Sequence, residues 1–520
     1  MNVVFRVDAS MVIGIGHVTR CLTLADTLRT RGIQCQFICR EHTGHLLSLL
    51  NDARMSVAVL SAPVNSRAEV RDKYASWLGA TQGEDAKQSV RALEGMRPDW
   101  IVVDHYALDV EWEQHLRPHA EQLMVIDDLA DRVHDCDLLL DQNFSVRGEG
   151  RYSGLVPEHC NVLLGPSFAL LRPEYRACKK ASKASGRELK RVFVFFGGSD
   201  PSNLTKLALE TLSQERWHKI GVDIVVGANY LYRQELERQA ADRPGTIIHG
   251  PCRHLAKLLA RADLAIGAGG VTTWERMCVG VPSIVVNVAE NQRSTCEALA
   301  EKGLIRYLGD AGDVSVAALS AAIDDALMSS DTEFPQSDRC QLVVDGLGTS
   351  RIAEIIDQTE AQELTLRKAC DDDVGLYYNW VNESQVRRNA LNSDLILWPQ
   401  HQAWFRARLA DRKSELYVME ARSLPVGQIR FDLSDSEARI DYSIDPTYRG
   451  RGWGKRLVAL GIDRMCDRGP VVFRAEVKAN NLPSAAVFQK LGFSLSALEG
   501  NDDLSVFQFD SAVQTLSELQ

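Results

Sequence analysis

The 520-residue sequence lacks several features that would each point to a particular class of protein. No uncharged apolar run approaches the ~20 residues that a membrane-spanning helix needs. The 12 cysteines are scattered and form no C-x-x-C pair, which favours a reducing compartment over a disulfide scaffold. Charge already appears at Arg6 and Asp8, where a signal peptide would continue into an apolar core. We therefore expect a cytoplasmic protein without a membrane partner.

The sequence also lacks an excess of basic charge, internal repeats and low-complexity tracts. Lys and Arg total 59 against 70 Asp and Glu, a net charge of −11, which gives no general attraction to nucleic acid. Hydrophobic residues make up 45% and charged residues 25%, as in ordinary globular proteins. At about 150 residues per domain the length predicts three or four domains. The sequence leaves the oligomeric state open.

The first two thirds of the chain alternates apolar runs with helical patterns, which is typical of parallel α/β units. A first series ends near residue 165, and a second begins with an apolar run at 192–196 and ends in a helix near 351–356. We expect two Rossmann-like domains, at 1–165 and 166–357, facing a cleft. The buried strands of the first series are predicted at 3–7, 36–39, 100–103 and 123–126.

The pattern changes after a polar stretch, Asp357–Glu363, which is interpreted as a linker. Runs at 417–419, 426–431 and 440–444 predict antiparallel strands, and a loop rich in glycine and arginine follows them. We expect an α+β domain at 364–515.

A glycine turn follows the first predicted strand. Arg6 and Asp8 lie at the end of that strand, and Gly14 and Gly16 precede His17 at the start of a helix. Glycine lets a ligand approach the backbone closely, and free N–H groups at a helix start suit an anionic or sugar oxygen. The positive end of the helix dipole also favours a neutral imidazole that can act as a base. A simple tight turn with a histidine near the cap remains an alternative.

Two adjacent carboxylates, Asp127 and Asp128, follow the strand at 123–126. They can bind sugar hydroxyls or amides, or they can cap the next helix. No histidine or glutamate lies at ligand spacing from them, so we expect no metal.

Two further glycine loops follow predicted strands in the second series. The loop after 192–196 contains Gly198 and Ser199, and the loop after 264–266 contains Gly269 and Gly270. Loops of this kind cradle a diphosphate at a helix start. Glu275 follows the second loop and either binds the nucleotide or closes a capping box with Thr272. A later polar turn contains Asn291 and Gln292.

Residues 5–25, with the segments 103–106 and 126–130, resemble the UDP-sugar hydrolases of the pseudaminic acid pathway, which are relatives of GT-B nucleotide-sugar enzymes. The resemblance covers about residues 1–355. It implies hydrolysis of UDP-2,4-diacetamido-2,4,6-trideoxy-β-L-altropyranose to UDP and free sugar by direct inversion. It further implies that His17 activates water, that Glu275 bonds the uridine ribose, and that Asn291 and Gln292 face the sugar.

A third glycine-rich loop lies in the last part of the chain, between a predicted strand and a helix. Consecutive N–H groups in such a turn make a pyrophosphate cradle, although an exposed basic loop is the alternative interpretation. The loop consists of Arg449, Gly450, Arg451, Gly452, Trp453, Gly454 and Lys455.

This loop, with Asn481 and Ser484 downstream, resembles the GNAT acetyltransferases over about residues 364–515. The resemblance implies that acetyl-CoA is the cosubstrate and that the acceptor is the 4-amino group of a UDP-4-amino-4,6-dideoxy sugar. We predict Glu476 as the general base, with a solvated strand residue as the alternative. GNAT enzymes usually have a tyrosine where this chain has Phe488, which raises the question of what protonates the thiolate; Tyr442 and Tyr448 lie nearby in sequence.

The two resemblances fall at consecutive steps of one pathway. The sequence therefore predicts a bifunctional enzyme that acetylates a UDP-amino sugar and then hydrolyses the product. The alternative is a GT-B glycosyltransferase fused to an acetyl-CoA-binding module whose role is shifted or non-catalytic.

Overall fold

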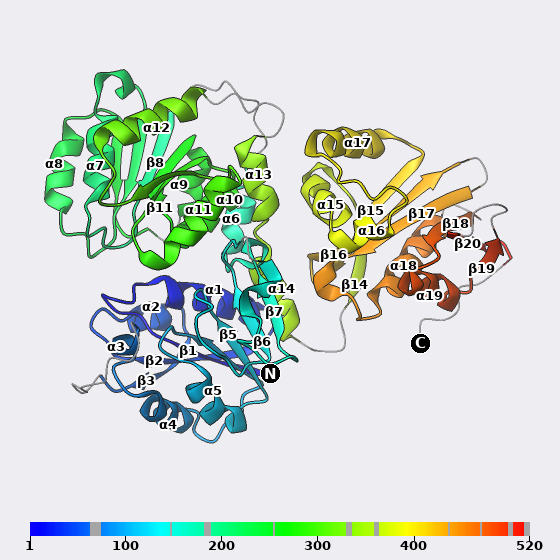
Figure 1. Ribbon diagram of the computed structural model, residues 1–520, viewed down its shortest axis with the longest axis horizontal. Helices are drawn as coiled ribbons and strands as arrows, with labels where there is room; N and C mark the ends of the chain where they lie inside the picture. The colour runs from blue at the N-terminus through cyan, green and yellow to red at the C-terminus, as the bar shows by residue number, and fades with distance from the viewer. Residues whose placement is uncertain are drawn as a thin grey trace. The chain divides into compact units, whose positions relative to one another are not determined.

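The computed structural model contains two compact units, Met1–Gln358 and Thr359–Gln520, which are described here one at a time (Figure 1). The structure describes residues 1–62, 74–145, 148–180, 189–252, 255–328, 335–357, 363–434, 437–467, 471–497 and 503–513. Most of the predicted linker, residues 358–362, lies outside the described residues.

The first unit begins with a seven-stranded sheet in the order β3-β2-β1-β4-β5-β6-β7, and every neighbouring pair is parallel. Strand β1 lies between β2 and β4, so the chain reverses its direction of growth across the sheet between β1 and β4. The carboxyl ends of two such strands form the usual ligand site of a doubly wound sheet. The strands are β1 (Asn2–Val7), β2 (Gln34–Arg40), β3 (Ser56–Leu60), β4 (Trp100–Asp104), β5 (Gln122–Ile126), β6 (Leu138–Asp141) and β7 (Asn161–Leu164).

A second parallel sheet follows, with six strands in the order β10-β9-β8-β11-β12-β13. The same kind of reversal occurs between β8 and β11. The strands are β8 (Arg191–Phe195), β9 (Gly221–Val225), β10 (Thr246–His249), β11 (Leu264–Ala268), β12 (Ser283–Asn287) and β13 (Arg306–Asp310).

Helices cover the faces of both sheets because the strands are apolar on both sides and need cover on both (Figure 1). Those of the first sheet are α1 (Gly16–Thr30), α2 (Leu47–Asp52), α3 (Ala75–Leu78), α4 (Gln82–Ala92) and α5 (Val110–Leu116). Those that follow are α6 (Pro173–Ala177), α7 (Leu204–Leu212), α8 (Arg233–Ala241), α9 (Leu255–Arg261), α10 (Thr272–Val279), α11 (Arg293–Glu301), α12 (Val316–Met328), α13 (Gln336–Val343) and α14 (Gly348–Ile356).

The last of these helices, α14, packs into the core of the first sheet although it follows the second sheet in sequence. Ile352 and Ile356 belong to the same buried cluster as Phe5 of β1. An ion pair of 2.8 Å joins Glu354 of α14 to Arg31 at the end of α1. The two sheets are thus connected by the chain twice, once after β7 and once before α14.

The second unit is built on a seven-stranded mixed sheet in the order β14-β15-β16-β17-β18-β20-β19. Its pairs are antiparallel except for β17 with β18, which are parallel and paired only from Glu437↔Val472 to Arg439↔Arg474. Beyond these three positions the described parts of β17 and β18 are not paired with each other. The strands are β14 (Leu364–Lys368), β15 (Ser414–Ala421), β16 (Leu424–Leu433), β17 (Glu437–Ile444), β18 (Val472–Lys478), β19 (Ser494–Ala497) and β20 (Leu504–Asp510).

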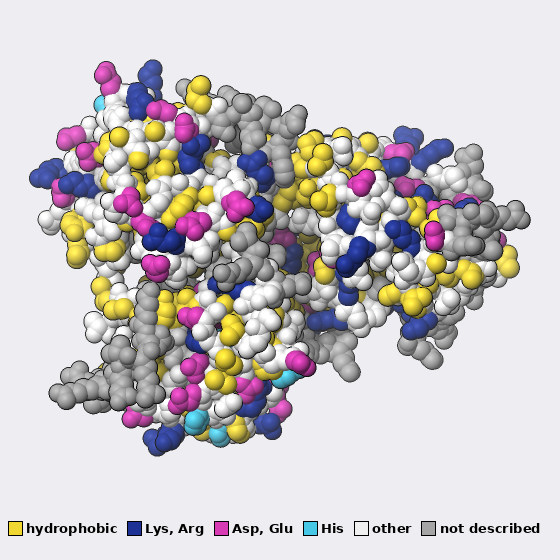
Figure 2. Space-filling model, viewed as in Figure 1, with side chains coloured by type: hydrophobic (Ala, Val, Ile, Leu, Met, Phe, Trp, Pro, Cys, Tyr) yellow, Lys and Arg dark blue, Asp and Glu magenta, His cyan; other side chains and the backbone are white. Residues whose placement is uncertain are grey.

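The helices of this unit are α15 (Val374–Val381), α16 (Ser384–Asn389), α17 (Trp398–Ala410), α18 (Trp453–Cys466) and α19 (Leu482–Lys490). The predicted fold class, two Rossmann-like sheets followed by an α+β domain, is confirmed. No helix in the described ranges is both long and apolar enough to cross a membrane. On the face shown in Figure 2, basic and acidic side chains are interspersed.

Candidate active sites

His17 is the second residue of α1, immediately after the glycine turn at the carboxyl edge of the first sheet. The turn contains Gly14, whose φ of +82° is a conformation that glycine adopts readily. The Nδ1 atom of His17 lies 2.6 Å from Oδ1 of Asp104, the last residue of β4. Both side chains are buried. The histidine and its carboxylate thus come from the two strand–helix segments that flank the β1/β4 reversal.

The charge state of Asp104 determines the tautomer of His17. Burial alone would raise the pKa of Asp104, but the Arg20 guanidinium and His17 hold this pKa well below its usual value. An ionised carboxylate only accepts hydrogen bonds, so the 2.6 Å contact requires a proton on Nδ1 of His17. In the neutral ring the Nε2 atom then keeps a free lone pair that can accept a proton.

Arg20, one turn further along α1, holds this pair in place. Its Nε and Nη2 atoms donate to the two oxygens of Asp104 at 2.6 and 2.7 Å. Its Nη1 atom reaches Oδ2 of Asp128 at 2.8 Å. A single guanidinium therefore joins the ends of β4 and β5 beneath the histidine.

Aromatic rings surround the same histidine. Tyr106 packs edge-on against the His17 ring at 4.7 Å between centroids, and its hydroxyl donates to Asp128 at 2.6 Å. Trp77 of α3 stacks on Tyr106 at 5.5 Å and is only partly buried. His17 therefore packs in an aromatic cluster of which Trp77 is the more exposed member.

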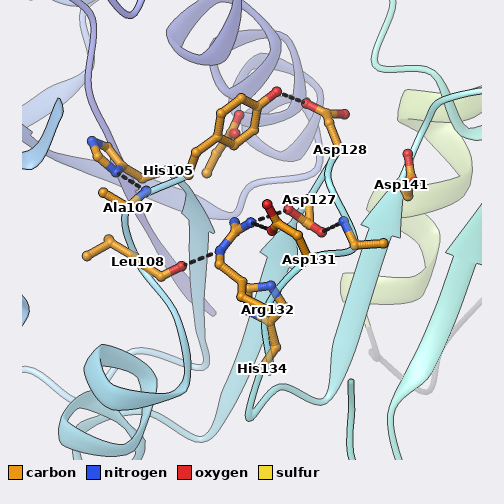
Figure 3. A network of polar contacts seen from close by, with 12 residues as sticks. His105, Ala107, Leu108, Asp127, Asp128, Asp131, Arg132, His134 and Asp141 are labelled. Carbon is orange, nitrogen blue, oxygen red and sulfur yellow. Dashed lines mark hydrogen bonds and ion pairs between the residues drawn. The ribbon is translucent and has the colours of Figure 1, made fainter. Parts of the chain in front are cut away.

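Asp127 and Asp128 lie next to each other but serve different contacts (Figure 3). Asp127 is fully buried, accepts the Ala130 N–H at 2.8 Å, and pairs with Arg132 at 2.9 Å. Asp128 faces Tyr106 and Arg20 instead. The protein's own donors therefore enclose Asp127, and Asp128 is the member of the pair that lies with the histidine.

Arg6 and Asp8 are fully buried beneath the turn. Arg6 pairs with Asp8 at 2.7 Å and with Asp85 of α4 at 2.6 Å. The backbone N–H of Arg40 also donates to Asp8, at 2.7 Å. Arg6 and Asp8 therefore bind other groups of the protein below the histidine turn. A direct contact of either residue with substrate stays a prediction.

The second glycine region lies at the β8/β11 reversal of the second sheet. Gly198 and Ser199 follow β8, and Gly198 packs so closely on Gly227 that a β-carbon on Gly227 would clash with the Gly198 carbonyl oxygen. Ser199 is exposed. The helix after this loop, α7, begins only at Leu204, where Asp200 accepts the backbone N–H groups of Leu204 and Thr205 at 3.0 and 2.8 Å.

Gly269 and Gly270 follow β11 and lead into α10. A β-carbon on Gly269 would clash with Sγ of Cys296, and one on Gly270 would lie 3.3 Å from Nε2 of Gln292. Gln292 therefore borders the glycine loop, and its Oε1 atom is buried without a hydrogen-bond partner. The neighbouring Asn291 is exposed.

Glu275 does not form the capping box that its spacing from Thr272 allows. The N-cap residue of α10 is Val271, and no side chain bonds the first N–H groups. Burial raises the pKa of Glu275, although Tyr175 donates a hydrogen bond to it. The Oε2 atom of Glu275 is buried and has no hydrogen-bond partner among the described residues.

Two contacts within the first unit bring the histidine turn close to the second sheet. A β-carbon on Gly16, the first residue of α1, would lie 3.7 Å from the Val271 side chain at the start of α10. The Met11 sulfur also lies 3.3 Å from the side-chain amide of Asn229. The starts of α1 and α10 are therefore adjacent.

In the second unit the predicted pyrophosphate loop leads into α18. Gly450 and Gly452 have φ of +82° and +75°, and no atom lies within 4 Å of a β-carbon built on either. The loop thus leaves open space next to the first N–H groups of α18. Trp453 is buried, while Gly454 and Lys455 of the first turn are partly exposed.

The two arginines of this loop differ in their contacts. Arg449 donates hydrogen bonds to the side chains of Gln385 and Glu383, each at 2.6 Å, and so joins the loop to the start of α16. Arg451 is exposed and packs over the rings of Tyr448 and Trp453. Arg451 is therefore the arginine that can turn to an anion.

A second helix start, that of α19, lies beside the first. Asn481 caps α19 by accepting the Ser484 N–H at 3.4 Å, and the Ser484 hydroxyl lies 3.2 Å from that of Tyr442. The Tyr442 ring packs edge-on against Phe488 at 5.7 Å. Tyr448 is fully buried and stacks on Trp453. The geometry thus distinguishes the two tyrosines that the sequence left open, since only Tyr442 adjoins Phe488 and the start of α19.

Glu476 lies on the polar face of β18 between two arginines. Arg474 donates to it at 3.3 Å, and Arg439 of β17 lies at 3.4 Å. Both arginines therefore pair with this carboxylate on the surface of the strand. A role of Glu476 as general base stays a prediction, and the ion pairs favour the alternative of a surface strand residue. In the part of the chain that the structure describes, no group of three His, Cys, Asp or Glu residues is placed to hold a metal ion.

The Asp104 network predicts an acid-sensitive contribution to stability. The folded-state pKa of Asp104 is below the ordinary value of 3.8, so its contribution is present above about pH 4 and is lost as the pH falls toward the folded pKa. Asp104→Asn should lower the unfolding free energy by about 3–5 kcal/mol at pH 7, because Arg20 loses a buried partner.

Thermal unfolding of the wild type and of Asp104→Asn at pH 7 and pH 3 measures this effect. The difference between their unfolding free energies should be smaller at pH 3. Asp26→Asn is the control, because Asp26 is an exposed residue of α1, the helix that carries Arg20, and its ion pair to Arg29 measures 3.7 Å. An equal difference in unfolding free energy at both pH values would contradict the lowered pKa of Asp104.

Two family matches divide the chain at the same place as the fold. Residues 192–359 match the glycosyltransferase family 28 C-terminal domain, and residues 363–494 match the acetyltransferase (GNAT) domain.

Individual relatives match different shares of the chain. An uncharacterised protein of Methanocaldococcus jannaschii is 22% identical over 513 residues, covering 95% of this chain and 96% of the relative. The UDP-2,4-diacetamido-2,4,6-trideoxy-beta-L-altropyranose hydrolase of Campylobacter jejuni is 25% identical over 58% of this chain and 97% of its own. The spore coat polysaccharide biosynthesis protein SpsG of Bacillus subtilis is 20% identical over 70% of this chain and all of its own. The chain therefore joins a GT-B-like region, homologous to these last two proteins, to a C-terminal GNAT acetyltransferase domain.

Proposed function

We propose that this protein is a bifunctional nucleotide-sugar enzyme of nonulosonic acid synthesis. Its GNAT domain transfers an acetyl group from acetyl-CoA to the amine of a UDP-4-amino-4,6-dideoxy sugar. Its first unit then hydrolyses the resulting UDP-2,4-diacetamido-2,4,6-trideoxy sugar to free sugar and UDP. The similarity to the Campylobacter jejuni hydrolase supports the second step, and the GNAT domain supports the first.

The observation that carries the hydrolase proposal is the 2.6 Å contact between His17 and Asp104 on a turn adjacent to the nucleotide loop. In the proposed reaction, Nε2 of His17 takes a proton from water as the water oxygen bonds to the anomeric carbon. The bond from that carbon to the diphosphate oxygen breaks, and UDP leaves with the electron pair. Asp104 stabilises the imidazolium that forms, as a buried carboxylate does in a catalytic triad.

We assign the nucleotide to the carboxyl edge of the second sheet. The glycine loop and the start of α10 present N–H groups to the diphosphate. The unpartnered Oε2 of Glu275 accepts a ribose hydroxyl, and Gln292 borders the sugar side of the loop. The leaving group and the base then lie on adjacent helix starts.

The acetyl transfer is assigned to the region between α18 and α19. The open space at Gly450 and Gly452 fits a pyrophosphate, and the unpaired edges of β17 and β18 fit the amide groups of the CoA arm. The sugar amine attacks the thioester carbon, a C–N bond forms, the C–S bond breaks, and the nitrogen gives up one proton to water. The thiolate then needs a proton, and Tyr442 is the hydroxyl we assign to this role.

A glycosyltransferase that passes the sugar to another acceptor is the second candidate, favoured by the match to the glycosyltransferase family 28 domain. Incubation with the UDP-sugar and no acceptor separates the two functions. Release of free sugar and UDP with full turnover supports the hydrolase, and its absence contradicts the hydrolase.

His17→Ala should lower the rate of sugar release at least about 100-fold, because general base catalysis contributes that much or more to a rate. Acetyl transfer should continue at the wild-type rate, because the GNAT domain uses none of these residues. Product analysis by mass spectrometry measures both reactions. His115→Ala, at an exposed position of α5, is the control. Retained hydrolysis in His17→Ala would refute the base assignment.

Gly452→Asp should prevent acetyl-CoA binding, since a carboxylate would enter the open space beside α18 and repel the pyrophosphate. The backbone there is also in the left-handed region, which disfavours a side chain. Calorimetric titration with acetyl-CoA measures the loss. Ala403→Asp adds the same charge at an exposed position of α17 and should bind normally. Equal affinity in both variants would argue against the cradle.

Tyr442→Phe should slow acetyl transfer about 100-fold while the KM for acetyl-CoA stays within about twofold, because only a proton donor is removed. Burial raises the pKa of Tyr442 to about 12, so its hydroxyl is protonated at neutral pH. Thiol release monitored with a chromogenic disulfide measures the rate. Tyr378→Phe removes a hydroxyl from α15 as the control, and an unchanged rate in Tyr442→Phe would exclude this residue as the donor.

A further inference from the structure

Arg276 of α10 is a buried guanidinium with unfilled hydrogen-bonding capacity. It is 1% exposed. Its Nη2 atom donates to the Ala268 carbonyl at 2.8 Å and to the Thr273 hydroxyl at 2.9 Å. Its Nε and Nη1 atoms are buried and have no hydrogen-bond partner. Two of its three nitrogens therefore lack the partners that buried polar groups normally have.

No carboxylate neutralises this charge within the described ranges of the chain. Arg6 and Arg20, which are also buried, each bind two carboxylates. Arg243 has no carboxylate, but carbonyl oxygens of Leu212, Trp217 and Ile220 occupy its donors. Burial lowers the pKa of Arg276 to about 10 despite the nearby Cys296 and Glu275, so the group is still charged at neutral pH. An unpaired buried charge is costly, and an anionic partner would offset that cost.

The position of Arg276 indicates where that partner binds. A β-carbon built on Gly267 of β11 would clash with the Phe195 carbonyl oxygen of β8 and would lie 2.5 Å from Nη1 of Arg276. The guanidinium therefore lies at the carboxyl ends of β8 and β11, where the second sheet reverses its order. Gly269 and Gly270 follow directly, so Arg276 lies next to the glycine loop that we propose binds the diphosphate.

We propose that Arg276 is the fixed positive charge of a diphosphate site, acting on the ligand through the glycine loop in front of it. In a water-poor site such a charge acts over several ångströms with little screening. It would favour a nucleoside diphosphate over a nucleoside, and it would stabilise the charge that gathers on the diphosphate as the sugar bond breaks. The inference deepens the proposed function and rests on it for the identity of the nucleotide.

Arg276→Gln and Arg276→Lys test the charge separately from the packing. Gln keeps a donor for the Ala268 carbonyl but has no charge, and Lys keeps the charge. Titration calorimetry with UDP and with uridine should show that Arg276→Gln weakens UDP binding at least tenfold and changes uridine binding less than twofold. Arg276→Lys should bind UDP closer to the wild type. Arg243→Gln, which removes a buried guanidinium whose donors are filled by carbonyls, is the matched control.

Equal losses for UDP and uridine in Arg276→Gln would overturn the proposal in favour of a packing role, as would an unchanged UDP affinity. Inorganic pyrophosphate gives a second measurement, should Arg276→Gln fail to fold. Gly452→Asp, in which the loop of the second unit is blocked, is the protein to use, and pyrophosphate should raise its melting temperature; no rise would also overturn the proposal.

The proposed function can fail independently of this inference. A wild type that binds UDP and pyrophosphate but releases no sugar contradicts the hydrolase and leaves the charge assignment in place. A wild type that hydrolyses the UDP-sugar, with Arg276→Gln binding UDP normally, contradicts the charge assignment alone.

Discussion

The carboxylate of Asp104 is the constraint on which the first site depends. It fixes the proton of His17 on Nδ1, and Arg20 fixes the carboxylate in turn. Because Arg20 also reaches Asp128, the ends of β4 and β5 and the start of α1 are held by charge-assisted hydrogen bonds out of water. Such a network holds the His17 ring in one orientation, which is the preorganisation that the proposed role as a base requires.

The sequence predicted the fold well where strands are buried on both faces. β1 and β4 are almost entirely buried and contain the apolar runs 3–5 and 100–103, which located them in the sequence. Strands such as β10 and β13 are only partly buried and carry polar residues, so no apolar run marked them. The return of α14 to the first sheet has no local signal, because its amphipathic pattern does not say which core it covers.

The same distinction applies to the sites. His17 and the glycine loops carry local signals, a turn before a helix, and were predicted. Asp104 and Arg20 act through contacts that span 84 residues, which spacing does not encode. The pattern Thr272-x-x-Glu275 was ambiguous because a capping box and a ligand-binding glutamate have the same spacing. The observed N-cap at Val271 excludes the capping box, and the ligand-binding role of Glu275 stays a prediction.

The return of α14 also determines which half of the first unit carries the GNAT domain. The chain continues to the second unit from the end of α14, which packs in the core of the first sheet, and not from the second sheet. A fragment of the chain that ended after β7 would therefore lack α14 and would leave the core around Phe5 without part of its cover.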